Sequence, residues 1–289
     1  MSNASTGALV VLAAGLSSRM KRSAAAGLQG SGLALEALQK SKSMIGLGSG
    51  GRPLLDYLLL NARDAGYGDI VIVVGERDEE IRARYRQPVG ALKGLTVSFA
   101  VQSIPPGRSK PPGTADALLC ALRARRDLRG GTFTVCNSDN LYSTGAMRSL
   151  LATPHPCALI DYDRDALRFS ESRIAQFAVL EKDARGFLRA IIEKPTPEDM
   201  MRVRDAAGRV GVSMNIFRFS YDMILGPLEE VPLHPVRQEK ELPAAVTLMI
   251  GKHPESMFTI PVSEFVPDLT SIDDIAEVRK FLEAYHQIE

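Results

Sequence analysis

Short runs of β-branched and other apolar residues alternate with stretches of helical length through the first half of this chain. The runs 9–12, 69–74, 97–101 and 132–136 have the composition of buried strands, and amphipathic stretches at 53–65, 79–86 and 116–125 separate them. This alternation is typical of βαβ units, whose strands form a mostly parallel sheet. Ligands bind such sheets beyond the carboxyl ends of the strands. We therefore expect a site in the loops that follow Leu12, Val101 and Cys136.

The second half has a different pattern, with longer strands that are joined by turns. Strands are predicted at 176–180, 188–193, 212–219 and 257–262, and helices at 221–228, 242–251 and 272–285. We expect a mixed-sheet extension here. The fold class is thus α/β, a Rossmann-like doubly wound and mostly parallel sheet with a mixed-sheet extension.

Charge and cysteine content narrow the function classes. Lys plus Arg number 35 and Asp plus Glu 34, a formal net charge of +1, which supplies no global field for nucleic acid or an anionic membrane. Cys120, Cys136 and Cys157 lie far apart without CxxC spacing, so neither a disulfide framework nor a zinc site is indicated. The first apolar run, 8–14, is too short to span a bilayer. We expect a soluble cytoplasmic protein, with no nucleic-acid or membrane partner, that recognises any phosphate locally.

The strongest local motif is the segment 12–20, in which a strand runs directly into a loop of small residues and then an arginine. Small residues let backbone N–H groups approach triphosphate oxygens, and Arg19 offers a bidentate guanidinium to pyrophosphate. The candidate nucleotide-binding residues here are Leu12, Ala13, Ala14 and Gly15. The alternative is a plain strand-turn-helix corner capped by Ser17 or Ser18.

Two further loops carry polar residues at strand ends. Gln102 can pair with a donor and an acceptor on a base edge, and Gly113-Thr114 lets the backbone lie against a ring. Asp139 follows the strand 132–136 and is a candidate Mg²⁺ ligand, because this ion prefers hard oxygen donors. A proline-stiffened crossover loop and an ordinary Asn/Asp turn are the alternatives.

Taken together and in order, these motifs resemble the sugar-phosphate nucleotidyltransferase superfamily, and in particular a less characterised bacterial branch of it. The loop 12–20 is similar to the family's L-x-A-G-x-G-x-R-M, Asp139 to its G-D-N aspartate, and Glu193-Lys194-Pro195 to its E-K-P. Ser17 and Ser138 stand where the family has glycine. The resemblance covers nearly the whole chain and implies the nucleotide-diphospho-sugar transferase type of fold. Residues 8–160 would form the NTP-binding half and 161–289 the acceptor-binding half of one domain.

The resemblance also implies an activity and a set of roles. A nucleoside monophosphate would pass from an NTP to a sugar 1-phosphate or similar phosphomonoester, with release of pyrophosphate and with Mg²⁺ as cofactor. Asp139 and Asp268 would hold the metal, and Arg19, Lys42 and Lys194 would act on the phosphates, with Lys40 as a competitor for the role of Lys42. Acceptor-binding residues would be Asn140, Glu193, Lys194 and Asn215. A homo-oligomer is compatible with this assignment.

Other function classes stay open at this stage. The segment 46–51 formally matches the NAD-binding GxGxxG, but it lacks the firm strand that this fingerprint needs before it, and no Gly-Lys-Ser/Thr follows for a P-loop. A catalytically idle regulatory protein that binds a nucleotide or sugar nucleotide is an alternative, as is a cytidylyltransferase acting on a non-sugar phosphate such as phosphocholine. The arginines at 123, 125, 126 and 129 are expected to be a solvated face rather than a binding module.

Overall fold

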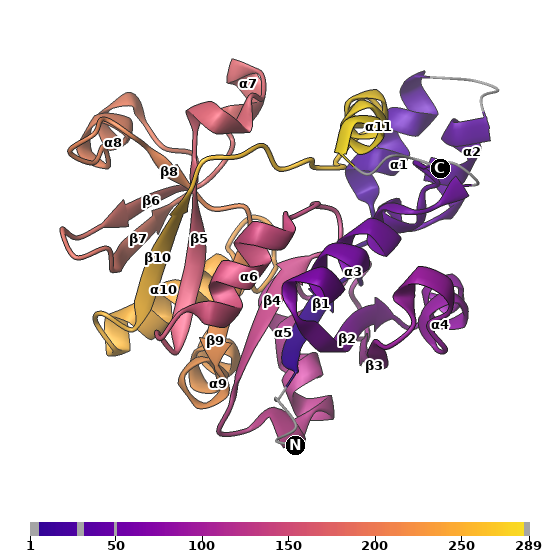
Figure 1. Cartoon of the computed structure of the whole chain (residues 1–289), viewed down its shortest axis with the longest axis horizontal. Coiled ribbons are helices and arrows are strands. Elements are labelled where there is room, and N and C mark those ends of the chain that lie inside the picture. The colour runs from indigo at the N-terminus through magenta and orange to yellow at the C-terminus, as the bar shows by residue number, and fades with distance from the viewer. Residues whose placement is uncertain (1–5, 28–31, 49–50, 286–289) are drawn as a thin grey trace.

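A single sheet runs through the whole molecule, and the two halves of the chain share it (Figure 1). The computed structural model describes residues 6–27, 32–48 and 51–285. Ten strands belong to the sheet in this part of the chain. They are β1 (Gly7–Leu12), β2 (Tyr67–Gly75), β3 (Thr96–Gln102), β4 (Thr132–Asn137), β5 (Cys157–Asp163), β6 (Val179–Lys182), β7 (Leu188–Ile192), β8 (Gly211–Val212), β9 (Ile216–Ser220) and β10 (Met257–Val262).

The strand order is β3-β2-β1-β4-β9-β5-β8-β6-β7, and β10 pairs with β5. The first four strands are parallel, with Val10 opposite Val71 on one side and opposite Val135 on the other. Strand β9 then inserts antiparallel between β4 and β5, and β6, β7 and β8 extend the sheet in antiparallel pairs. The predicted fold class, a mostly parallel doubly wound sheet with a mixed extension, is confirmed.

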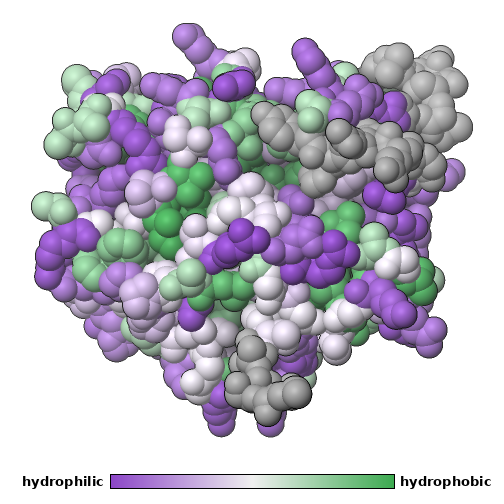
Figure 2. Space-filling view, viewed as in Figure 1, coloured by the Kyte–Doolittle hydropathy of each residue, from purple (hydrophilic) through white to green (hydrophobic). Residues whose placement is uncertain are grey.

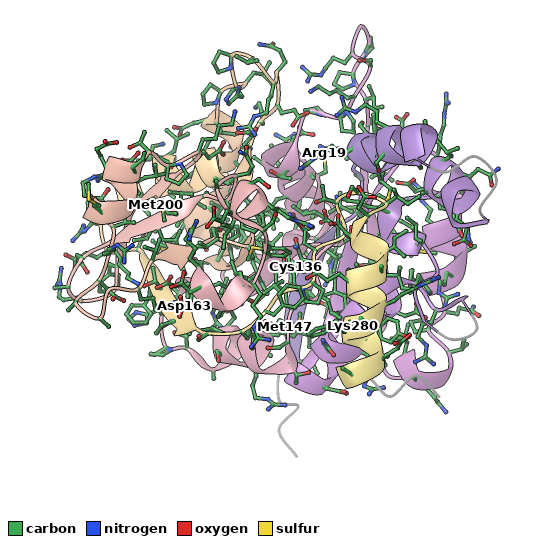
Figure 3. The ribbon with its side chains drawn as sticks, turned by 90° about the horizontal axis from the view of Figure 1, so that it is seen from above. Arg19, Cys136, Met147, Asp163, Met200 and Lys280 are labelled. Atoms are coloured by element: carbon green, nitrogen blue, oxygen red, sulfur yellow. The ribbon has the colours of Figure 1, made fainter. Side chains whose placement is uncertain are left out.

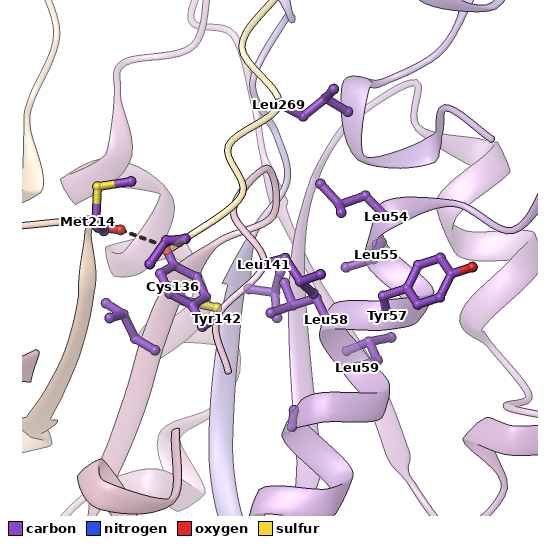
Figure 4. Close-up of a cluster of buried hydrophobic side chains, with 14 of the residues drawn as sticks. Leu54, Leu55, Tyr57, Leu58, Leu59, Cys136, Leu141, Tyr142, Met214 and Leu269 are labelled. Carbon is purple, nitrogen blue, oxygen red and sulfur yellow. Dashed lines mark hydrogen bonds between the residues drawn. The ribbon is translucent and has the colours of Figure 1, made fainter. Parts of the chain in front are cut away.

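Helices cover both faces of the sheet, and the side chains of the central strand alternate between them. Leu9 and Val11 of β1 belong to one buried cluster, which Figure 4 shows in part, whereas Val10 and Leu12 belong to the other. Helices α3 and α6 pack into the first cluster, and α5, α9 and α10 into the second. The longer helices are α1 (Ser18–Gly27), α2 (Gly32–Gln39), α3 (Leu54–Ala65), α4 (Glu79–Tyr85), α5 (Thr114–Ala124), α6 (Thr144–Ala152), α9 (Tyr221–Glu230), α10 (Leu242–Lys252) and α11 (Asp274–Tyr285). Shorter turns of helix are η1 (Lys42–Met44), η3 (Gly90–Leu92), η4 (Arg126–Leu128), η5 (Asp165–Leu167), α7 (Glu171–Ile174) and α8 (Pro197–Arg202).

The predicted strands of the first half all form, but several elements of the second half differ from the prediction. The strand predicted at 212–219 is two strands, because the chain breaks at Ser213–Asn215, where Asn215 adopts a left-handed backbone with φ 57°. Strand β5 and helix α6 were not predicted. Residues 176–178 precede β6 rather than belong to it, because the turn after α7 occupies them.

The segment after β10, residues 263–273, brings the second half of the chain back over the first. We call it the closing segment. It crosses the edge of the sheet and leads into α11, which lies beside α1 (Figure 1). The N–H of Ile272 donates to Ser23 Oγ of α1 at 3.0 Å, and Arg279 of α11 donates to the carbonyl of Gly46 at 3.1 Å. The end of the chain is therefore fastened to the elements that follow β1.

On the face shown in Figure 2, hydrophilic and hydrophobic residues are interspersed. Among the helices of the described residues, none has both the length and the apolar character needed to cross a membrane.

Candidate active site

The loop after β1 leads into α1, and backbone N–H groups at the N-terminus of a helix can bind an anion. Ala13 is held to the sheet because its N–H donates to the carbonyl of Val73 at 2.9 Å. Ser17 has a left-handed backbone, φ 54°, and its hydroxyl accepts a hydrogen bond from the N–H of Lys42 at 3.0 Å. Arg19 is exposed at the start of α1 (Figure 3). The loop and the segment that carries Lys42 are thus fixed to one another.

Lys42 and Asp139 form an ion pair across this loop, Nζ to Oδ2. Asp139 follows β4, whose neighbour in the sheet is β1, so both side chains reach the same sheet edge. Lys40 points elsewhere and pairs with Glu36 at 3.2 Å and Glu80 at 3.4 Å. Of the two lysines considered from the sequence, Lys42 is the one that faces Asp139.

Asp268 reaches the same place from the closing segment. Asn140 and Asp268 form an antiparallel bridge, and the N–H of Leu269 donates to the carbonyl of Asp139 at 2.8 Å. Burial raises the pKa of Asp268 above its ordinary value, and the negative charge of Asp139 raises it further. The two carboxylates predicted to share a metal are therefore neighbours.

Asp268 is also held by a residue that sequence reasoning missed. Arg173 of α7 donates to Asp268 Oδ2 at 2.8 Å and to its backbone carbonyl at 3.0 Å, and it also pairs with Asp274. The hydroxyl of Thr270 lies 3.1 Å from each carboxylate oxygen of Asp268. No sequence motif marks Arg173, because its contacts join segments that are far apart in the chain.

The loop 103–113, which we call the base loop after the role predicted for it, contributes Lys110, Pro111 and Gly113 to the cavity described below. Gln102 is buried, and its amide nitrogen donates to the carbonyl of Gly113 and to Asp116, both at 2.8 Å. Both N–H donors of Gln102 are thus engaged within the protein, so its amide does not offer the donor that was expected to pair with a base edge. Thr114 begins α5, and its hydroxyl accepts from the N–H of Leu242 at 2.9 Å.

Only two of the four predicted acceptor-binding residues line the cavity that is described below. Glu193 and Asn215 line the cavity. Lys194 is exposed next to Glu193, with φ 49°, and is not among the lining residues. Asn140 is buried, and its Oδ1 accepts a hydrogen bond from Tyr142 at 3.3 Å.

Most of the candidate residues border one cavity of about 410 Å³, a volume in the usual range for a small-molecule site. In the described part of the chain it is lined by Leu12 to Leu16, Ser18, Arg19, Ser41, Lys42, Gln102, Lys110, Pro111, Gly113, Thr114, Ala117, Asn137 to Asp139, Glu193, Asn215, Arg237, Glu239 and Glu241 to Pro243. Sequence reasoning gave no role to Lys110, Arg237, Glu239 or Glu241.

The donors present suit a hard divalent cation. Asp139 and Asp268 supply carboxylate oxygens, and Mg²⁺ is commonly held by one or two carboxylates together with substrate phosphates and water. Among the described residues there is no cluster of three or more His, Cys, Asp or Glu side chains that would hold a metal without a substrate.

Two alternative motifs have structural roles. The glycine-rich segment 46–51 follows the short helix η1 rather than a strand, and its Leu47 and Gly48 donate to the carbonyl of Arg52 in a turn before α3. In the arginine run, Arg125 pairs with Asp69 and Asp127, and Arg123 lies 3.5 Å from Glu229. Residues 49 and 50 lie outside the described part of the chain, and none of the described residues of either motif borders the cavity.

The sheet order and the cavity at its edge define an α/β protein with the nucleotide-diphospho-sugar transferase type of fold. Residues 9–203 match the family model described as the MobA-like NTP transferase domain. The chain belongs to this family, and the predicted membership of the nucleotidyltransferase superfamily is confirmed.

Relatives and a solved structure agree with this assignment. The chain is 28% identical over 151 residues to the bifunctional protein GlmU of Trichlorobacter lovleyi, covering 52% of this chain and 30% of that protein. It is 29% identical over 225 residues to GlmU of Corynebacterium diphtheriae, covering 76% and 38%. It thus spans well under half the length of these relatives. A structure of UDP-glucose pyrophosphorylase complexed with UDP-glucose superimposes with a TM-score of 0.69 at 16% identity, over 98% of this chain and 100% of that one, and so shares the fold.

Proposed function

We propose that this chain is a Mg²⁺-dependent nucleotidyltransferase that transfers a nucleoside monophosphate from an NTP to a sugar 1-phosphate and releases pyrophosphate. The observation that carries the proposal is the meeting of Lys42, Asp139 and Asp268, from three distant segments, beside the loop that follows β1. The UDP-glucose complex of the structurally similar pyrophosphorylase supports a sugar phosphate as acceptor.

The reaction follows from the charges of the substrates. A phosphate oxygen of the acceptor bonds to the α-phosphorus of the NTP, and the bond from that phosphorus to the bridging oxygen breaks, so that pyrophosphate leaves. No general base is required, because a phosphate monoester is already ionised near neutral pH. The task of the protein is to position two anions and to neutralise the charge that develops.

Each of the predicted site residues named below has a role in this scheme. Arg19 and Lys42 neutralise the departing pyrophosphate, and the N–H groups at the start of α1 bind its oxygens. Asp139 and Asp268 would hold Mg²⁺, which would supply positive charge to neutralise the substrate phosphates. Lys194 and Glu193 serve the acceptor, and Gln102, Gly113 and Thr114 serve the base.

The test is a pyrophosphate-release screen of four NTPs against glucose, galactose, mannose and N-acetylglucosamine 1-phosphates and phosphocholine, each with Mg²⁺ or EDTA. We expect turnover with at least one sugar 1-phosphate, and only with Mg²⁺. A protein that binds nucleotide but releases no pyrophosphate with any pair would be the idle regulatory protein instead.

Two lysine variants sharpen this screen. Lys42→Met removes the cation that faces Asp139, and we expect turnover to fall at least about a hundredfold, as when a charge-stabilising group is lost. Lys40→Met is the matched control, because it removes only the partly exposed pairs with Glu36 and Glu80. Equal activity in the two variants would contradict the assignment of Lys42.

A further inference from the structure

Around Glu193, the cavity contains further charged side chains that the reaction above does not use. They belong mainly to the segment between α9 and α10, residues 231–241, which we call the bridging loop. Arg237, Glu239 and Glu241 of this loop line the cavity, together with Glu193 after β7 and Lys110 of the base loop. Three carboxylates and two cations therefore line a part of the cavity that the scheme above does not assign to the departing pyrophosphate.

Arg237 connects two of these carboxylates. Its Nη2 donates to Glu193, its Nε lies 2.7 Å from Glu241 Oε1, and its Nη2 lies 2.9 Å from Glu241 Oε2. The guanidinium is a rigid planar fork, so it fixes the distance and the orientation between the two carboxylates. Glu241 is 14% exposed, and burial raises its pKa, so the charge of Arg237 also helps to keep it ionised.

The bridging loop is fastened to the base loop at several points. Lys110 and Glu239 form an ion pair at 2.6 Å, and the N–H of Ala115 donates to the carbonyl of Lys240 at 3.0 Å. Gly113 has φ 117°, and a Cβ at this position would lie 2.4 Å from the Lys240 carbonyl oxygen. The segment that positions the Arg237 side chain is thus anchored on the base loop and the start of α5, while the side chain itself reaches Glu193 after β7.

The chemistry of the pair indicates what it binds. An ionised carboxylate only accepts hydrogen bonds and has about four lone-pair sites, so Arg237 leaves several acceptor positions on Glu193 and Glu241 unused. Neighbouring hydroxyl groups of a sugar are donors that fit these positions. A quaternary ammonium group is usually held by aromatic faces, and no aromatic side chain is among the described residues that line the cavity.

We propose that Arg237 is a specificity-determining residue, which holds Glu193 and Glu241 as a paired acceptor site for the hydroxyl groups of a sugar phosphate. This inference rests on the proposed nucleotidyl transfer and specifies the class of acceptor. Arg237 itself is a positioning residue, because it acts through the two glutamates.

The experiment uses the full chain with the NTP and sugar 1-phosphate that give the highest turnover in the screen, and compares Arg237→Met with Arg237→Lys and Arg123→Met. Methionine keeps the apolar stem of Arg237 and removes its five donors. Arg123 is the matched control, because it is an exposed arginine whose contact, with Glu229, lies outside the cavity. Thermal unfolding of each variant checks that it is folded.

For Arg237→Met we expect KM for the sugar 1-phosphate to rise about tenfold or more, the usual effect of losing hydrogen bonds to charged groups, with kcat and KM for the NTP nearly unchanged. Arg237→Lys should restore only part of the loss, and Arg123→Met should match the wild type. A deoxy-sugar 1-phosphate should be discriminated against less strongly by Arg237→Met than by the wild type.

Several results would overturn the inference while leaving nucleotidyl transfer intact. One is an unchanged KM for the sugar 1-phosphate in a folded Arg237→Met variant, and another is an equal loss in kcat and in KM for the NTP. A wild-type preference for phosphocholine would overturn the acceptor class. If no NTP and acceptor pair releases pyrophosphate in the wild type, it is the proposed function that fails.

Discussion

At the scale of single residues, Ser17 shows how this chain departs from a glycine-rich loop and keeps its geometry. Its backbone has φ 54°, a conformation that glycine adopts without strain and that serine adopts at a cost of about 1–2 kcal/mol. The serine hydroxyl offsets part of this cost, because it accepts the hydrogen bond from the N–H of Lys42. A glycine at this position would lack that contact, so the serine links the loop to the segment that carries Lys42.

Glu264, in the closing segment, provides a prediction about pH. Burial raises the pKa of its carboxyl, against a hydrogen bond with Ser143 that lowers it, and its Oε1 is buried without a hydrogen-bond partner in the described structure. The folded state therefore holds this proton more tightly than the unfolded state. Below the pKa of the unfolded state, the carboxyl is protonated in both states, and its burial costs no stability through ionisation. As the pH rises from that pKa to the higher pKa of the folded state, the free energy of unfolding falls.

Glu264→Gln should accordingly stabilise the protein at pH 7 by about 1 kcal/mol, and much less at pH 4, since glutamine carries no charge to desolvate. The measurement is the free energy of unfolding by urea at both pH values. Glu283→Gln, at an exposed position of α11, is the control and should change little. A gain at pH 4 that equals the gain at pH 7 would contradict the role of ionisation.

At the scale of elements, the contact between the base loop and the bridging loop depends on one glycine. Gly113 and Gly107 both have a left-handed backbone, but of the two only Gly113 lies against other backbone, that of Lys240, whose carbonyl oxygen would be 2.4 Å from an added Cβ. Gly107 has open space around it. A pair of alanine variants therefore separates the strain of the backbone from the close approach of the two loops.

Gly113→Ala should cost about 2–4 kcal/mol of stability and raise KM for the NTP about tenfold, because the two loops must separate. Gly107→Ala should cost about 1 kcal/mol, the backbone strain alone, and leave KM unchanged. Urea unfolding and initial rates of pyrophosphate release measure both effects. Similar behaviour of the two variants would show that the contact between the loops is unimportant for nucleotide binding.

The elements themselves were predictable to different degrees. The strands β1, β2 and β4 contain apolar runs that are buried on both faces, so their composition identifies them, and the edge strand β3 is only partly buried but also contains an apolar run. Strand β5 (157–163) was not identified, because its apolar run 157–160 is followed directly by Asp161, Tyr162 and Asp163, whose two carboxylates hide the strand pattern. Asp161 is fully buried and pairs with Lys182 and Arg209, contacts that depend on tertiary structure and leave no local pattern.

At the scale of the whole molecule, the site depends on the closing segment. This segment places Asp268, from near the end of the chain, beside the residues that follow β4. Motif order predicted that Arg19, Lys42 and Asp139 would lie near one sheet edge, since the strands before them are neighbours. The partners of Asp268 were beyond prediction, because Arg173 and the bridge to Asn140 arise only when the second half folds back over the first. For the same reason Arg237 and Glu241 were missed.

The central claim is that Asp139 and Asp268 act together on one substrate-bound metal. The direct test is the rate of pyrophosphate release in Asp139→Asn, Asp268→Asn and the double variant, with the exposed Asp222→Asn as control. We predict that each single variant loses at least about a hundredfold in kcat and that the double variant loses little more, because residues that act as a unit are not additive. Near-normal turnover by Asp268→Asn, or a double variant whose loss is the product of the two single losses, would contradict the claim.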